Sequence, residues 1–172
     1  MVKVLSFIRA ARERVKLKSA MKAREIVRLH VIAAGDSAQE QGIKLIVRDA
    51  ILRAFAAPFK QAHSAQEALQ IIQSHLSAIE EVARRTARAQ GYLGPVQAVT
   101  GVFPFPDRTY DGVLVPGGAY PALRVILGGG AGQNWWCILY PALCLSIAST
   151  DPANVENAAF EWHLPDIFRL WF

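Results

Sequence analysis

The stretch at residues 128–144 reads GGGAGQNWWCILYPALC and holds two of the chain's four tryptophans and both of its cysteines. Four glycines stand among its first five residues, and the adjacent Trp135 and Trp136 follow. In an extended backbone, neighbouring side chains point to opposite faces, so the two indoles cannot enter one core. We expect one of them to be buried, and the stretch to form a stiffened aromatic loop after a core strand.

Upstream of this stretch, two helices are predicted between the first and second strands. Two serines stand three residues before a glutamate, the spacing of a capping box: Ser37 with Glu40, and Ser64 with Glu67. Pro58 and Gly91 are typical of positions at which a helix ends. We therefore expect helices over about 37–57 and about 64–90.

On the first of these helices, Lys44 and Arg48 stand four residues apart and are expected to share an exposed face. Asp49 follows Arg48 directly. Because neighbouring residues on a helix point in different directions, no ion pair between Arg48 and Asp49 is expected.

Alternating apolar residues predict short strands at residues 28–34, 96–103, 113–115, 122–127 and 160–164. A short docked helix is expected to close the chain. The order of these elements favours an α+β fold, with two long helices packed on a mostly antiparallel sheet of about four to five strands. Residues 26–172 are expected to form this one domain, since the chain is long enough for a single sizeable core.

The net charge of +5 comes from one end of the chain. Residues 1–28 hold nine basic and two acidic residues, whereas the rest holds ten and twelve. This near-neutral body argues against nucleic acid as a partner. For the basic arm at residues 1–25, two interpretations stay open: a poorly ordered tail, or an amphipathic helix that contacts a membrane surface. The arm lacks the uninterrupted apolar core of a secretory signal.

The glycine-rich stretch fails the tests for a phosphate or metal site. Gly132 is not followed by the lysine of a phosphate-binding loop, and Gln133 breaks the dinucleotide fingerprint. Cys137 and Cys144 do not have the spacing of a zinc knuckle, and the four histidines are scattered. We expect no metal, cofactor or small-molecule substrate.

Two states of Cys137 and Cys144 remain open, a local disulfide or a reduced pair of small buried residues. A nucleophilic Cys137 would need a base, and the fold would have to bring His30 or His163 to it. A cysteine-dependent hydrolase of cell wall or peptide is therefore the alternative function. His30 itself is more typical of a structural histidine, although Asp36 lies close in sequence.

Several of these segments resemble the stage II sporulation protein R family: RLHVIAAGDS (28–37), KLIVRDAIL (44–52), the run at residues 118–144, and EWHLPDIF (161–168). The signature G-x-N-W-W-C-x-L-[FY]-P-x-L-C, here residues 132–144, is highly specific. The resemblance extends over residues 26–172. Members typically begin with an apolar export or anchor segment, where this chain has its basic arm. Their Asn-Ser-Asp-Ser after the first strand is replaced here by Ala-Gly-Asp-Ser, which keeps the helix cap.

The resemblance implies a signalling protein rather than an enzyme. Members are exported from the forespore into the space between its membrane and that of the mother cell. There they activate a membrane aspartic protease of the mother cell, which processes the sigma-E precursor. The family motif carries over, without individual roles, to His30, Asp36, Arg48, Asp49, Arg124, Asn134, Trp135, Trp136, Cys137, Pro141 and Cys144.

From the resemblance and the aromatic cluster together, we predict the residues that contact the protease. A tryptophan of the pair, acting with Tyr140, would form an exposed apolar contact, because aromatic residues dominate interface hot spots. The predicted contact residues are Asn134, Trp135, Trp136 and Tyr140. A disulfide between Cys137 and Cys144, formed after export, would stiffen the loop that carries them.

Overall fold

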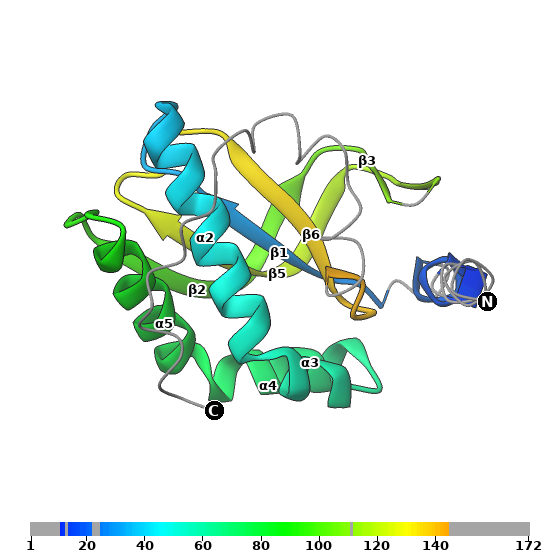
Figure 1. Cartoon of the computed structure of the whole chain (residues 1–172). Helices are drawn as coiled ribbons and strands as arrows, with labels where there is room; N and C mark the ends of the chain where they lie inside the picture. The colour runs from blue at the N-terminus through cyan, green and yellow to red at the C-terminus, as the bar shows by residue number, and fades with distance from the viewer. Residues whose placement is uncertain (1–10, 13, 22–24, 111, 145–172) are drawn as a thin grey trace, which may run out of the picture.

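The computed structural model describes residues 11–12, 14–21, 25–110 and 112–144, and Figure 1 shows a sheet with helices packed across it. Its elements follow in chain order: β1 (Val27–Ile32), α2 (Ala38–Ala54), α3 (Ala56–Gln61), α4 (Ala65–Ser74), α5 (Leu76–Ala89), β2 (Val96–Phe105), β3 (Arg108–Tyr110), β4 (Val113–Val115), β5 (Gly118–Leu127) and β6 (Asn134–Tyr140). The α+β class is therefore confirmed.

The main sheet has four strands in the order β2-β5-β1-β6, and β3 pairs with β4 in a separate small sheet. The pairings β2–β5 and β1–β6 are antiparallel, whereas β1 runs parallel to β5. This confirms a mostly antiparallel sheet. The first strand thus lies between the last two strands that the structure describes, and His30 stands between Arg124 on β5 and Trp136 on β6.

The expected two long helices are four shorter ones. The first helix ends at Ala54, and Pro58 lies in the first turn of α3, where a helix does not need the amide that proline lacks. The second is interrupted at His75, whose Nδ1 lies 2.8 Å from the carbonyl oxygen of Ile71. Side chains that bond a nearby carbonyl compete with the helical hydrogen-bond ladder.

Both predicted serine caps are present, but only the first forms the full capping box, because Glu67 accepts a hydrogen bond from the His63 amide instead of that of Ser64. The Ser37 and Glu40 side chains each bond the other residue's backbone amide, which completes a capping box. The Ser64 side chain accepts a hydrogen bond from the Glu67 amide.

The aromatic stretch is not a loop, and this expectation was wrong. Residues 134–140 form β6, with the glycine-rich turn before it and a short turn at residues 141–142 after it. Gly128 and Gly130 in that turn have φ values of 62° and 66°, the left-handed region that glycine adopts without strain. Any side chain at residue 132 would collide with the carbonyl of Gly35. Because Gly132 has none, the turn can lie directly against the chain after β1.

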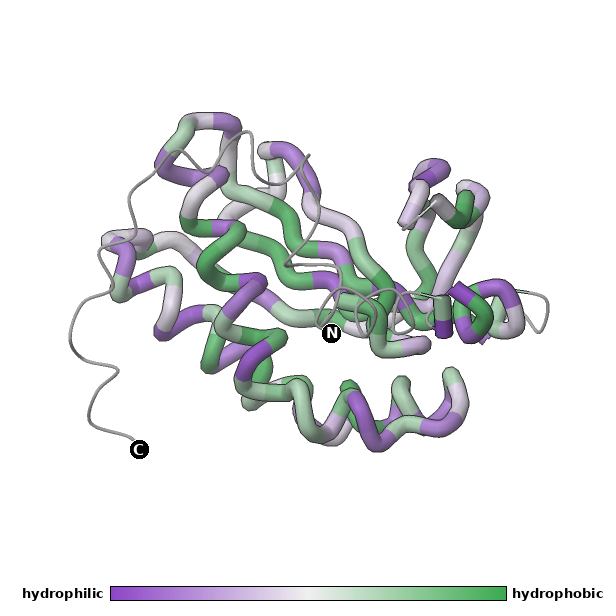
Figure 2. Tube along the Cα trace, turned by 45° about the vertical axis from the view of Figure 1, so that its right-hand side comes forward, coloured by the Kyte–Doolittle hydropathy of each residue, from purple (hydrophilic) through white to green (hydrophobic). Residues whose placement is uncertain are grey.

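The two faces of the main sheet carry different cores. The face toward the helices packs against α2 to α5 with Leu29, Val31, Leu123, Val125, Trp135, Cys137 and Leu139. Figure 2 shows these central strands as the most hydrophobic part of the trace. We call the opposite side the far face; by strand register it carries Arg28, His30, Phe103, Phe105, Tyr120, Arg124, Asn134 and Trp136.

A second, smaller core lies where the far face meets β3, β4 and the N-terminal residues. Its buried members are Leu17, Ala20, Ile26, Tyr110, Val113, Val115, Ile138 and Leu143. Residues 11–12 and 14–21 are helical, so a poorly ordered tail is the wrong description for them. The expected strand at 160–164 and the helix after it lie outside the described residues. None of the helices described here is long and apolar enough to cross a membrane.

Candidate functional site

The two adjacent tryptophans of β6 lie on opposite sides of the sheet, as strand alternation requires. Trp135 faces the helices and is 6% exposed, which confirms that one of the pair is buried. The guanidinium carbon of Arg48 lies 4.7 Å from the centre of a Trp135 ring. A cation over an indole is attracted by its π-electrons, so Trp135 joins β6 to α2.

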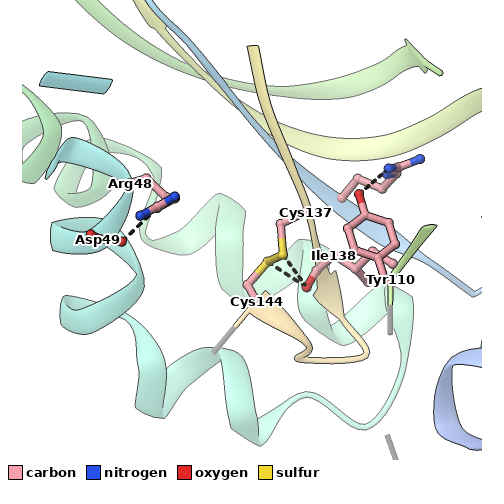
Figure 3. The surroundings of a disulfide bond; sticks show 7 residues. Arg48, Asp49, Tyr110, Cys137, Ile138 and Cys144 are labelled. Atoms are coloured by element: carbon pink, nitrogen blue, oxygen red, sulfur yellow. Dashed lines mark hydrogen bonds and ion pairs between the residues drawn. A yellow bond between two sulfur atoms is a disulfide. The ribbon is translucent and has the colours of Figure 1, made fainter. Parts of the chain in front are cut away.

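The expected exposed face of α2 is in fact covered. Lys44 and Arg48 are 5% and 6% exposed, because β6 and the turn before it lie over them. Nε of Arg48 pairs with Oδ1 of Asp49 at 2.8 Å, which corrects the expectation that these neighbours do not interact (Figure 3). The guanidinium group of Arg48 therefore contacts both Asp49, through Nε, and the Trp135 ring, through its flat face.

Asp36 fastens the turn between β5 and β6 to the start of α2. Its carboxylate accepts hydrogen bonds from the Gln133 amide at 2.6 Å and from the Gln41 side chain at 3.2 Å. Lys44 Nζ donates to the Gln133 carbonyl at 3.1 Å. Burial, with a smaller contribution from Arg48, lowers the pKa of Lys44 to about 8. These motif residues therefore hold the turn in place.

On the far face, His30 stacks on Trp136, with ring centres 3.8 Å apart and planes 23° apart. The ring of Phe105 stands edge-on to Trp136 at 4.9 Å. His30 is 3% exposed, and burial lowers its pKa to about 4, with the charges of Arg124 and Arg28 acting in the same direction. The Asn134 side chain opposes this shift and raises the pKa by more than either arginine lowers it, although neither ring nitrogen makes a hydrogen bond of normal geometry within the described chain.

Arg28, which was predicted to begin the first strand but was given no role in a site, is fully buried on this face. Its guanidinium carbon lies 4.3 Å from the centre of Phe105 and 5.2 Å from that of Tyr120. Its Nη2 donates to the Tyr110 hydroxyl at 2.7 Å. Only the alternation of Arg28 with His30 in the first strand pointed to this position, because residues two apart share a face.

Cys137 and Cys144 form a disulfide with Cα atoms 5.7 Å apart, and both are buried (Figure 3). The bonded sulfurs carry no proton, so the approach of Cys144 Sγ to the Ile138 carbonyl at 2.8 Å is a close contact rather than a donated bond. Cys137 faces the helices, whereas His30 is on the far face. The predicted pairing of Cys137 with His30 is therefore not formed, and the other predicted base, His163, lies outside the described residues.

The predicted contact residues do not gather on one surface. Tyr140 packs on the helix side, where its hydroxyl donates to the His63 carbonyl at 2.7 Å. Trp136 is half-buried on the far face beside the exposed Asn134. Pro141 is buried after β6. Contact with a partner through Trp136 and Asn134 stays a prediction, and the described residues hold no cluster of three metal-ligating side chains.

Comparison with known proteins places these features in a family. The family model described as stage II sporulation protein R matches residues 23–150. A curated relative of that name from Bacillus subtilis (strain 168) is 34% identical over 133 residues, which make up 77% of this chain and 59% of the relative. No solved structure matches. The matched span covers most of the chain and includes Trp135, Trp136, Cys137 and Cys144. This chain therefore belongs to the stage II sporulation protein R family.

Proposed function

We propose that this protein is a sporulation signal that activates a membrane aspartic protease of the mother cell, which then processes the sigma-E precursor. Membership of the stage II sporulation protein R family is the observation that carries this proposal. The protein would act after export into the space between forespore and mother cell. It would act by binding, with no cofactor and no small-molecule substrate.

The exposed end of β6 supports a binding role. Trp136 offers part of an indole, and the exposed Asn134 beside it offers an amide. Large aromatic side chains next to polar groups are typical of interface hot spots. We therefore assign the protease contact to Trp136 and Asn134. Trp135 and Tyr140 would support this surface from the helix side.

A second contact is proposed for the basic helix near the N-terminus. Leu17 and Ala20 pack against the second core, so Lys16 and Lys18 are left exposed on the outer side. Basic side chains near an anionic bilayer are attracted by about 1 kcal/mol each. The helix would bring the protein close to the membrane in which the protease is embedded.

The hydrolase alternative has no comparable support. Both cysteines are bonded to each other. His30, which was predicted as one of two possible bases, lies on the opposite face of the sheet from Cys137. A thiol must ionise before it can attack a substrate, so a bonded sulfur cannot serve as the nucleophile.

The test uses sporulating Bacillus subtilis cells that lack their own relative. This chain is produced in the forespore behind the relative's export segment, and processing of the sigma-E precursor is followed by immunoblot. We expect processing to be restored. Secreted protein that is detected outside the forespore but leaves the precursor intact would refute the proposal.

Two variants separate contact from folding. Trp136→Ala should reduce processing, because the loss of a hot-spot tryptophan costs about 2 kcal/mol or more of binding free energy. Leu93→Ala is the matched control, since Leu93 is 83% exposed and lies on the loop before β2. Circular dichroism of both purified variants verifies that they fold. Equal processing by both folded variants would remove Trp136 from the contact.

A further inference from the structure

The far face of the sheet gathers three nitrogen-rich side chains around one point. Arg28 and His30 are two residues apart on β1, and Arg124 stands directly beside His30 on β5. Side chains paired across neighbouring strands have Cβ atoms about 5 Å apart. The three side chains therefore form one cluster, which we call the far-face cation cluster.

This cluster has no acidic partner within the described chain. The residues that share the far face of the four strands are aromatic, apolar or amide-bearing, and none is an aspartate or a glutamate. The charged groups that act on His30 are Arg124 and Arg28, both cations. Buried charges in proteins are normally paired, because leaving one unpaired in a low-dielectric interior is costly.

Unused hydrogen-bond donors point to the missing partner. Nε and Nη1 of Arg28 and Nε of Arg124 are buried donors without a hydrogen-bond partner in the described structure. Both ring nitrogens of His30 also lack a partner there, and one of them is a donor in the neutral ring. Arg28 is 0% exposed and His30 is 3% exposed. The aromatic rings around Arg28 stabilise its charge but accept no conventional hydrogen bond from these nitrogens. The cluster thus presents donors without an acceptor.

The surroundings of the cluster define the kind of acceptor that fits. The guanidinium carbon of Arg124 lies 3.9 Å from the centre of Phe103, and Trp136 covers His30. Arg124, Phe103 and Trp136 are each partly exposed, so solvent reaches this side of the cluster. An arginine fork matches the two oxygens of a carboxylate. The aromatic walls would pack against the short aliphatic stem that carries it.

We propose that the far-face cation cluster binds a carboxylate side chain of an acidic polypeptide segment. The carboxylate would accept hydrogen bonds from Arg124 and His30, and its charge would compensate Arg28 behind them. Phosphate fits less well, because phosphate sites typically use backbone amides at helix N-termini, and this face is built from strands. The inference does not depend on the proposed function.

We assign the carboxylate to a partner rather than to this chain. All three residues of the cluster lie within the family match at residues 23–150. Asp151 and Glu156 lie beyond this match and outside the segments that resemble the family. Glu161 and Asp166 also lie beyond the match but belong to the resembling segment at 161–168, so the test below neutralises them as well. A site built by the shared domain is expected to be filled by a shared partner.

The test titrates the full chain, labelled for NMR, with a glutamate-rich synthetic hexapeptide, its glutamine counterpart and inorganic phosphate. We expect the glutamate peptide alone to shift the Arg124 side-chain signal and to raise the pKa of His30, because a nearby anion favours the protonated ring. Arg124→Gln should weaken binding at least about tenfold, since a hydrogen bond to a charged group is lost. Arg53→Gln, an exposed arginine on α2, is the matched control and should bind normally.

Four results would overturn the assignment. Failure of the glutamate peptide to bind both the native chain and the variant with Asp151, Glu156, Glu161 and Asp166 neutralised would remove the carboxylate site, as would equal binding by Arg124→Gln. If phosphate binds in an Arg124-dependent manner and the peptide does not bind, the ligand of the cluster is a phosphate group and not a carboxylate. Binding only after Asp151, Glu156, Glu161 and Asp166 are neutralised would show that the occupant belongs to this chain and not to a partner.

Discussion

At the scale of single residues, each tryptophan of β6 is held by a nitrogen-bearing side chain on its own side of the sheet. Arg48 lies over Trp135 on the helix side, and His30 stacks on Trp136 on the far face. Each contact joins β6 to a neighbouring element through a residue that the family motif contains. The motif residues therefore act as packing partners of the tryptophans before any partner binds.

Replacement of Trp135 by alanine should strongly destabilise the fold. The side chain is 6% exposed, and removal of a buried tryptophan typically costs about 3–5 kcal/mol through lost transfer energy and the cavity left behind. Urea unfolding measures the change in free energy. Leu114→Ala, at a residue that is 56% exposed, serves as control and should cost far less. Similar losses in both variants would contradict the packing described here.

His30 should make stability depend on pH. Its folded pKa of about 4 is below the ordinary value of 6.5, so the unfolded chain binds the proton more readily. Stability contributed by neutral His30 is complete above about pH 6.5 and is lost as the pH falls toward about 4. The loss is on the order of 3 kcal/mol. Arg124 and Arg28 face the ring and oppose its protonation, and Asn134 partly favours it.

The measurement compares urea unfolding of the wild type and His30→Gln at several pH values. The variant should show a shallower fall in stability between pH 6.5 and pH 4, because its side chain does not titrate. Carboxylates elsewhere contribute equally to both proteins, so the difference isolates His30. Parallel curves for the two proteins would rule out this role.

Single-residue patterns predicted some of this site and missed the rest. Strand alternation was sufficient to predict that Trp135 and Trp136 face opposite ways. The burial of Lys44 and Arg48 did not follow from helix periodicity, because what covers α2 is a strand about ninety residues away in the chain. Arg28 was missed for the same reason, since its aromatic neighbours come from β2 and β5.

At the scale of elements, the turn between β5 and β6 is fixed by Lys44 of α2 and by Asp36, two residues before this helix. Asp36→Ala should cost about 1–3 kcal/mol, because the Gln133 amide loses its acceptor. Asp36→Asn keeps an acceptor oxygen and should retain much of the stability. Hydrogen exchange at the Gln133 amide should become faster in the alanine variant. Unchanged exchange there would show that the turn holds its shape without Asp36.

The disulfide connects β6 to the turn that follows it. A closed loop of this length should contribute about 2–3 kcal/mol by restricting the unfolded chain. The double variant Cys137→Ser, Cys144→Ser should therefore unfold at lower urea concentration than the oxidised protein. Reduced wild type provides the control with native side chains. Labelling of two free thiols in protein purified without reductant would refute the bond.

Element boundaries show how far local signals reach. The two serine caps depend on residues three apart in the chain, and both were predicted correctly. The interruptions at Phe55 and His75 depend on packing and on the bond from the His75 ring to Ile71. The residues of β6 were expected to form a loop because their strand character depends on pairing with β1, far away in sequence.

At the scale of the whole molecule, the position of β1 assembles the site. It pairs with β5 in parallel and with β6 in antiparallel fashion, which sets His30 between Arg124 and Trp136. Nothing local in the sequence specifies that the first strand lies between the last two, since such pairings form between residues about one hundred positions apart. The fold class was therefore predictable, but the residues that meet at the far face were not.

The same arrangement makes the N-terminal helix part of the fold. Leu17 is 1% exposed and packs in the second core with residues of β3, β4 and β6. Leu17→Ala should therefore cost about 2–5 kcal/mol, as for other buried leucines. Val15→Ala, two residues away at a side chain that is 68% exposed, is the control and should be nearly neutral. Urea unfolding at equal protein concentration measures both. If Leu17→Ala is as neutral as its control, the helix does not contribute to the stability of the domain, and the second core is held by β3, β4 and the sheet alone.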